Sequence, residues 1–254
     1  MGRLAFHSLV FVIWILGACS AVTVPQQPLK ETGTSLSSHE PTLSICAPCS
    51  RDQAEAWERD AERDAWSALR AANCYLFLVT RQTERELKLS DARKGRELAK
   101  RAVARYPRSG LAHYLYAYLT GLVAENDPLR GLELVPVIEQ EARSASTLNP
   151  SIDKGGPDRM LGELYLKAPA FPVSIGDAEK SVAAYQKAVD IAPEHTENRL
   201  GLADALLQLG EREAACGQLH RALRAMPPAD STRVAWQHAL DLLNRLCTAK
   251  GSEQ

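Results

Sequence analysis

The chain contains six cysteines and six histidines, the side chains best suited to redox, nucleophilic or metal chemistry. Cys46 and Cys49 form a CxxC pair, a spacing found in redox disulfides and in half of a zinc site. Neither function fits well, because no strand precedes the pair and no second pair of ligands completes a zinc site. The spacing therefore favours a structural disulfide or unreactive thiols.

The histidines show no pattern typical of a metal site. They are His7, His39, His113, His195, His220 and His238, and they form neither an HxxxH pair nor a cluster with cysteine or glutamate. The chain also lacks a nucleophile elbow, and Gly155-Gly156 does not open a GxxxxGK[ST] phosphate loop. We therefore predict no catalytic residue, no bound metal, no cofactor and a function other than catalysis.

The composition indicates a packed helical domain. The 254 residues are 45% hydrophobic, which is enough to bury a sizeable core. Aromatic residues make up only 6% and alanine is abundant, which suits close packing of helices. The formal net charge of −1 gives no electrostatic footprint for nucleic acid, so we predict no nucleic-acid partner.

Residues 1–18 have the features of an export signal. One arginine precedes an apolar run from Leu4 to Leu16, shorter than the roughly 20 residues of a membrane-spanning helix. The run ends in Leu16-Gly17-Ala18-Cys19, which resembles the cleavage box of bacterial lipoproteins. That resemblance implies acylation of Cys19 and a lipid anchor on the periplasmic side of the envelope, with Ser20 favouring the outer membrane. An uncleaved anchor and ordinary secretion are the alternatives.

The remaining chain divides by composition. Residues 19–50 are rich in proline, serine and threonine without helical periodicity, so we expect a flexible tether. Residues 51–249 are dominated by helical patterns and should form one domain, followed by a tail at 250–254. Within the domain we expect a helix break near Ala72–Asn73 and an extended apolar loop at Ala168–Ile175.

One stretch, residues 199–227, has the pattern of a helical hairpin. Leucines and alanines recur three or four residues apart up to Gly210, which can adopt positive φ and end a helix. A second apolar stripe with small alanines follows, and Pro227 ends it. A helix, a glycine turn, a second helix and a closing proline are typical of one tetratricopeptide unit.

The end of this unit, an alanine followed five residues later by a proline, recurs upstream. The pairs are Ala102–Pro107, Ala145–Pro150, Ala188–Pro193 and Ala222–Pro227. Successive prolines lie 43, 43 and 34 residues apart, against a tetratricopeptide period of about 34 residues. We interpret the extra residues as insertions between helices. The predicted fold is all-α, a tetratricopeptide-like solenoid of about four irregular repeats with a capping helix from Ser231 to Cys247.

Cys216 and Cys247 lie on neighbouring antiparallel helices in this scheme. Counted from the connection at Met226–Ser231, they lie ten and sixteen residues away, an offset of roughly 9 Å along the helix axis. A disulfide requires Cα atoms within about 7 Å. We therefore predict that both thiols are buried and unpaired. Five thiols remain beside Cys19, an odd number that leaves at least one without a partner in the chain.

The segment from Gly155 to Ala203 carries a distinctive set of residues. It contains Gly155-Gly156-Pro157, Arg159, Leu161-Gly162, Tyr165, Pro169, Gly176-Asp177, Lys180, Ala188, Ala192-Pro193-Glu194 and Asn198-Arg199-Leu200. Together with the lipoprotein signal and the long repeats, this segment resembles the T-component (TatT) family of tripartite ATP-independent periplasmic (TRAP) transporters. The resemblance extends roughly from Trp57 to Leu246.

The resemblance implies an all-helical periplasmic lipoprotein that binds the solute-binding protein of a TRAP transporter. It also implies homo-oligomers and a pocket or pore for a small hydrophobic ligand, with candidate lining residues Tyr114, Tyr116, Tyr118, Arg159, Tyr165 and Phe171. The alternative is an adaptor lipoprotein for envelope or outer-membrane assembly, which would hold a protein segment on its concave face. A tunnel through the domain would favour the first function, and an open polar groove the second.

Overall fold

The computed structural model describes residues 43–224 and 233–247, and this part of the chain is built from α-helices. They are α1 (Arg51–Asp60), α2 (Ala65–Arg81), α3 (Arg85–Arg105), α4 (Gly110–Asn126), α5 (Pro128–Leu148), α6 (Gly156–Lys167), α7 (Ala178–Ile191), α8 (Thr196–Gln208), α9 (Arg212–Ala222) and α10 (Arg233–Leu246). A short 3-10 helix, Ile152–Lys154, precedes α6. The predicted signal peptide (1–18), Cys19, most of the tether and the tail (250–254) lie outside the described residues.

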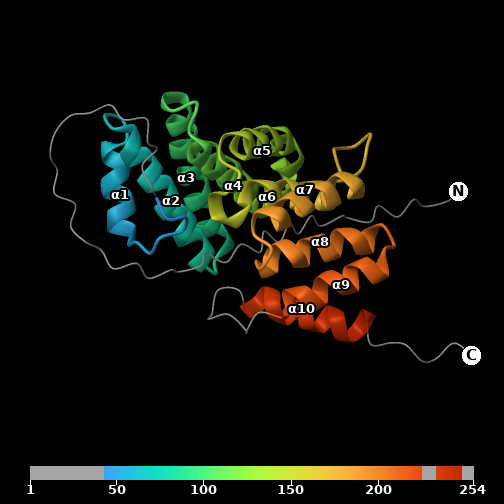
Figure 1. Cartoon of the computed structure of the whole chain (residues 1–254). Coiled ribbons are helices and arrows are strands. Elements are labelled where there is room, and N and C mark those ends of the chain that lie inside the picture. The colour runs from blue at the N-terminus through green and yellow to red at the C-terminus, as the bar shows by residue number, and fades with distance from the viewer. Residues whose placement is uncertain (1–42, 225–232, 248–254) are drawn as a thin grey trace, which may run out of the picture.

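The helices pack as antiparallel hairpins stacked in sequence order (Figure 1). The hairpins are α2/α3, α4/α5, α6/α7 and α8/α9, with α1 against α2 and α10 against α8 and α9. The first helices of successive hairpins also contact one another, so α2, α4, α6, α8 and α10 form one row. The predicted all-α solenoid of four repeats and a capping helix is confirmed.

A buried alanine near the end of each second helix explains the recurring Ala-to-Pro interval. Ala102, Ala145, Ala188 and Ala222 are at most 2% exposed, and each lies where a small side chain lets two helices approach closely. The two 43-residue intervals between prolines accommodate their extra residues differently. In the second hairpin they lengthen α4 and α5 to 17 and 21 residues, so the predicted insertion between helices is wrong there. In the third hairpin they form the loop between α6 and α7, as predicted.

The break in the N-terminal helical region lies at residues 61–64, and the prediction of a break near Ala72–Asn73 is wrong. Asp64 caps α2 by accepting hydrogen bonds from the backbone N–H groups of Trp66 and Ser67. Asn73 continues the helix because its side chain is used in a tertiary contact. Its Oδ1 accepts from the Cys46 N–H at 2.8 Å, and its Nδ2 donates to the Ser44 carbonyl at 2.9 Å.

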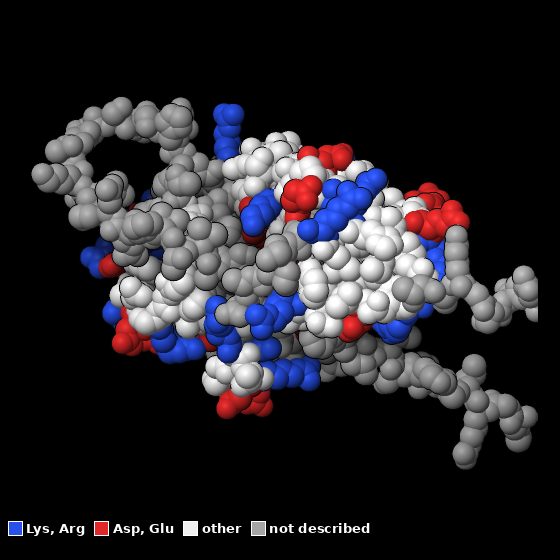
Figure 2. Space-filling model, turned by 60° about the horizontal axis from the view of Figure 1, so that its bottom comes forward, with Lys and Arg blue, Asp and Glu red and all other residues white. Residues whose placement is uncertain are grey.

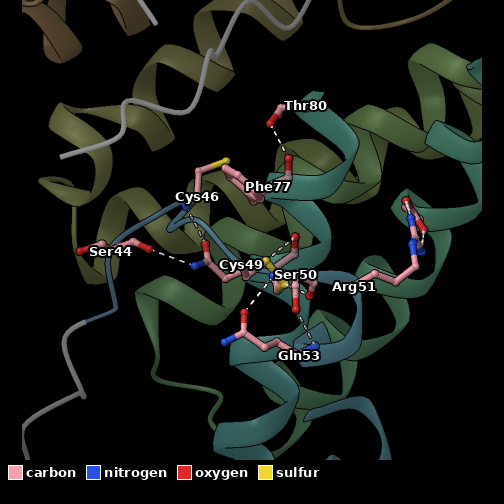
Figure 3. Close-up of a disulfide and its surroundings, with 11 residues drawn as sticks. Ser44, Cys46, Cys49, Ser50, Arg51, Gln53, Phe77 and Thr80 are labelled. Carbon is pink, nitrogen blue, oxygen red and sulfur yellow. Dashed lines mark hydrogen bonds and ion pairs between the residues drawn. A yellow bond between two sulfur atoms is a disulfide. The ribbon is translucent and has the colours of Figure 1, made fainter. Parts of the chain in front are cut away.

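The packed domain begins earlier than expected, because residues 43–50 are held against α2 and are no part of a flexible tether (Figure 3). Leu43 and Ile45 pack on the core, and Cys46 is 2% exposed. Ser50 starts α1 with a capping box, in which its side chain accepts from the Gln53 N–H and the Gln53 side chain accepts from the Ser50 N–H. The predicted boundary at Ser50 is therefore too late.

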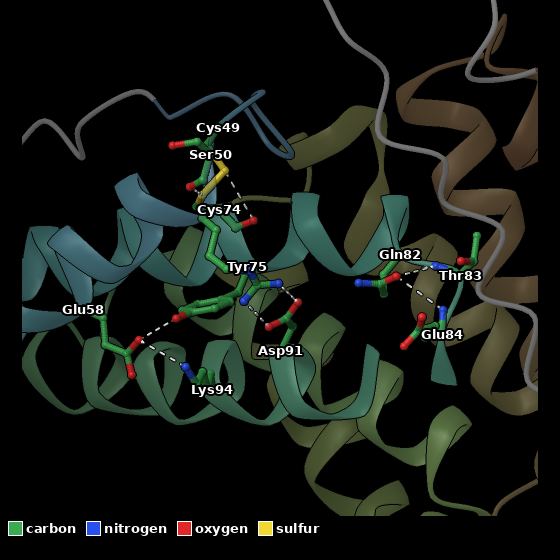
Figure 4. A network of polar contacts seen from close by, with 11 residues as sticks. Cys49, Ser50, Glu58, Cys74, Tyr75, Gln82, Thr83, Glu84, Asp91 and Lys94 are labelled. Carbon is green, nitrogen blue, oxygen red and sulfur yellow. Dashed lines mark hydrogen bonds and ion pairs between the residues drawn. A yellow bond between two sulfur atoms is a disulfide. The ribbon is translucent and has the colours of Figure 1, made fainter. Parts of the chain in front are cut away.

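The CxxC cysteines do not bond to each other. Cys49 forms a disulfide with Cys74 of α2, with Cα atoms 5.8 Å apart, which ties the N-terminal segment to the first hairpin. Cys46 is disulfide-bonded as well. Close by, Tyr75 donates a hydrogen bond of 2.5 Å to Glu58, and Arg51 makes two hydrogen bonds to the buried Asp91 (Figure 4). The disulfide and these contacts join α1, α2 and α3 into one unit.

Cys216 and Cys247 form a disulfide with Cα atoms 5.8 Å apart, so the prediction that they are unpaired is wrong. The prediction assumes that the end of α9 and the start of α10 lie side by side at the connection. In the structure α9 ends at Ala222, and it is the start of α9 and the end of α10 that lie side by side. There the Arg212 side chain donates a hydrogen bond to the Leu246 carbonyl. Both cysteines are half-buried there. The predicted start of the last helix, Ser231, lies outside the described residues.

The surface carries charges of both signs. Lysines, arginines, aspartates and glutamates are interspersed on the face shown in Figure 2, without a large area of one sign. No helix within residues 43–224 and 233–247 is long and apolar enough to cross a bilayer.

Candidate functional site

A cavity of about 520 Å³ lies between α4, α6, α8 and α10, on the row formed by the first helices of the hairpins. This volume is in the range of small-molecule sites in proteins, roughly 300–1,000 Å³. Its apolar walls come mainly from Ile138, Met160, Leu164, Leu166, Leu200 and Val234. Glycines of three helices also line it, Gly121, Gly156 and Gly201, and their lack of side chains leaves room.

A buried arginine closes one side of this cavity. Arg159 of α6 donates hydrogen bonds to the Asp153 carboxylate at 2.5 Å and to the Asn198 side-chain oxygen at 2.9 Å. Its Nε also lies 3.6 Å from a carboxylate oxygen of Glu197. Burial lowers the pKa of Arg159, but the two carboxylates raise it further, so the guanidinium stays charged. Its charge is neutralised within the protein.

Two tyrosines of α4 stand one helical turn apart beside Arg159. The rings of Tyr114 and Tyr118 meet edge to face, with centroids 5.8 Å apart. The Tyr114 hydroxyl donates to Asp153 at 2.8 Å. Burial and the nearby Asp153 charge raise the pKa of both phenols, which therefore remain neutral. They present aromatic surface to the cavity.

A third tyrosine, Tyr185 of α7, packs between α6 and α8 and reaches the same cavity. Gly162 and Gly201 contact opposite edges of its ring, and a Cβ atom at either glycine would overlap the ring. Its hydroxyl donates to Glu163 at 2.6 Å, and Glu163 also forms an ion pair with Lys167 one turn along α6. These contacts fix the Tyr185 ring and pair the Glu163 carboxylate with the Lys167 ammonium group.

One further carboxylate, Asp204 of α8, faces the cavity. Burial raises its pKa to about 6, and Glu163 adds to the rise, whereas the charges of His238 and Lys167 oppose it. His238 comes from α10, the capping helix, which therefore contributes a titratable group to the site as well as apolar wall.

The structure brings three of the predicted lining residues together at this cavity, Tyr114, Tyr118 and Arg159. The other three lie elsewhere. Tyr116 points from the other side of α4 toward Arg96 of α3, and Tyr165 donates to Glu139 of α5 at 2.6 Å. Phe171 is 88% exposed in the loop that projects between α6 and α7 (Figure 1).

Five residues that line the cavity are not among the predicted ones: Glu163, Tyr185, Glu197, Asp204 and His238. A signal for two of them is present in α8. Glu197, Gly201 and Asp204 are spaced four and three residues apart, which puts them on one helix face with the apolar Leu200. Acidic residues on an otherwise apolar face of a repeat helix indicate a buried polar site.

Fold and site together define a tetratricopeptide-like solenoid with a half-open, largely apolar cavity between its helices. A family model for the tetratricopeptide repeat matches residues 175–235, a segment that includes α7, α8 and α9. Among solved structures, the chain is similar to TTC0263, a thermophilic TPR protein of Thermus thermophilus, with 22% identity and a TM-score of 0.54. The alignment covers 74% of this chain and 89% of that one. This likeness concerns the fold. No curated protein matches the chain.

Proposed function

We propose that the protein is a periplasmic accessory protein that holds a small apolar ligand and serves a solute-binding protein, in the manner of the TRAP transporter T component. The observation that carries this proposal is the largely apolar cavity between α4, α6, α8 and α10. Gly156, Arg159 and Leu200, three of the residues on which the resemblance to that family rests, line it. An apolar cavity favours this function over an adaptor that holds a protein segment in a polar groove.

Filling the cavity should abolish ligand binding. Leu200 is buried and lines the cavity, so Leu200→Trp places an indole in the space that a ligand would occupy. We expect the neutral fluorescent probe N-phenyl-1-naphthylamine to bind the wild type at least tenfold more tightly than this variant, as measured by fluorescence titration. The matched control is Leu148→Trp at the exposed end of α5, which should bind like the wild type. Equal affinities of all three proteins would contradict a ligand site here.

Isolation of the native protein from its own envelope after mild crosslinking tests the partner and the anchor together. We expect mass spectrometry to find a periplasmic solute-binding protein among the captured chains, and a diacylglyceryl group on Cys19. A thioether and a disulfide at the Cys19 thiol exclude each other, so peptide mapping under non-reducing conditions gives a clear result. A peptide that links Cys19 to another cysteine would rule out the lipid anchor. Capture of outer-membrane assembly subunits alone would support the adaptor instead.

A further inference from the structure

The cavity contains a carboxylate without a counterion in contact. Asp204 lines it from α8, and within the described residues no donor forms a hydrogen bond or ion pair with its side chain. It shares its helix face with Leu200 and Gly201, both of which also line the cavity. The carboxylate therefore faces the space that a ligand would fill.

The other charges of the cavity are already engaged. Arg159 is held between Asp153 and Glu197, and Lys167 is paired with Glu163. These pairs combine two cations with three carboxylates, and Asp204 adds a fourth. These four carboxylates outnumber the two lysine and arginine side chains, and this excess of negative charge complements a cationic ligand.

The position of Asp204 is unfavourable for the protein by itself. Burial holds the pKa of its carboxyl at about 6, above the value of 3.8 for a free side chain, because the charged form is poorly solvated there. Near neutral pH the group is nevertheless ionised. A bound cation would supply the interaction that the protein does not provide, and charged groups kept at such a cost are typical of binding sites.

We propose that the cavity binds an amphiphilic amine, with the alkyl chain along the walls formed by Met160, Leu164 and Leu200 and the ammonium group on Asp204. The inference rests on the proposed ligand-binding function and names the ligand class for the same site. The ammonium donates to the carboxylate in a charge-assisted hydrogen bond, while the chain fills apolar space that is accessible to small molecules. An alkyl carboxylate would place its charge against the excess acidic groups and is disfavoured.

Calorimetric titration with n-decylamine, n-decanol and n-decanoate at pH 8 tests the proposal. We expect the wild type to bind the amine about tenfold or more tightly than the alcohol, and the carboxylate most weakly. Asp204→Asn keeps the shape of the side chain and removes its charge. This variant should fold, as checked by its thermal melt, and it should bind the amine no more tightly than the alcohol.

The outcomes separate this inference from the proposed function. Binding of the alcohol without preference for the amine, or a preference for decanoate, overturns the inference and leaves an apolar ligand site. Failure of all three probes to bind overturns both. The preference should also weaken as the pH falls below about 6, because Asp204 then becomes neutral. The charged and titratable groups that face Asp204 are Glu163 and Lys167 of α6 and His238 of α10.

Discussion

Replacing Arg159 by methionine should lower the free energy of unfolding by about 3–5 kcal/mol, because it removes one partner of a buried charge cluster. The side chain of Arg159 is 12% exposed and that of Glu197 is 7% exposed. Without the guanidinium, the buried Glu197 carboxylate and the half-buried Asp153 carboxylate both lose their ion pair with Arg159. Asn198 and Tyr114 also lose the arrangement that Arg159 holds. Denaturant unfolding at pH 7 measures the loss.

Arg143→Met is the matched control. Arg143 pairs with Glu139 one turn away on α5, but its side chain is 60% exposed, so water already screens the charge. We expect a loss of less than about 1 kcal/mol, the usual contribution of a surface ion pair. Equal losses at the two positions would contradict the role that the structure gives to burial at Arg159.

Gly201→Ala should destabilise the domain by about 3 kcal/mol, although alanine favours a helix over glycine. The new methyl group would overlap the ring of Tyr185, which is 1% exposed. The ring cannot move away, because Gly162 contacts its other edge and Glu163 holds its hydroxyl. The destabilisation from overpacking therefore exceeds the stabilisation from the higher helix propensity of alanine. Thermal or denaturant unfolding should show a clear loss of stability.

The same substitution at another helical glycine should raise the stability of the domain. Gly217 lies on the exposed side of α9, and a Cβ atom there would meet nothing within 4 Å. Gly217→Ala should stabilise the domain by about 0.5–1 kcal/mol through helix propensity alone. A loss at Gly217, or a gain at Gly201, would show that the packing around Tyr185 is looser than the structure indicates.

The hairpins could be predicted from the sequence because their signals are local. A proline after a helix ends it wherever the helix lies, and a small residue such as Ala188 is required where two helices approach closely. The order of the hairpins then follows from short connections. The disulfide between Cys216 and Cys247 could not be predicted in this way, since it depends on how far α10 slides along α9.

The cavity was predictable only in part. Helix periodicity separates Tyr114 and Tyr118 from Tyr116, because a shift of two residues turns a side chain by about 200° around the helix axis. The predicted lining residues nevertheless include all three tyrosines. The groups that meet across the cavity, Glu163, Asp204 and His238, come from three helices of the stack. Their proximity results from the stacking of repeats, which no spacing within one helix encodes.

The shared cavity has a consequence for the mechanics of the array. In a stack of repeats each unit touches only its neighbours, so the ends can unfold while the middle stays intact. A molecule in the cavity would contact α4, α6, α8 and α10 at once and so link units that are not neighbours in the stack. Occupancy would convert a chain of semi-independent hairpins into one cooperative block. Its C-terminal half would then remain assembled for as long as the ligand is bound.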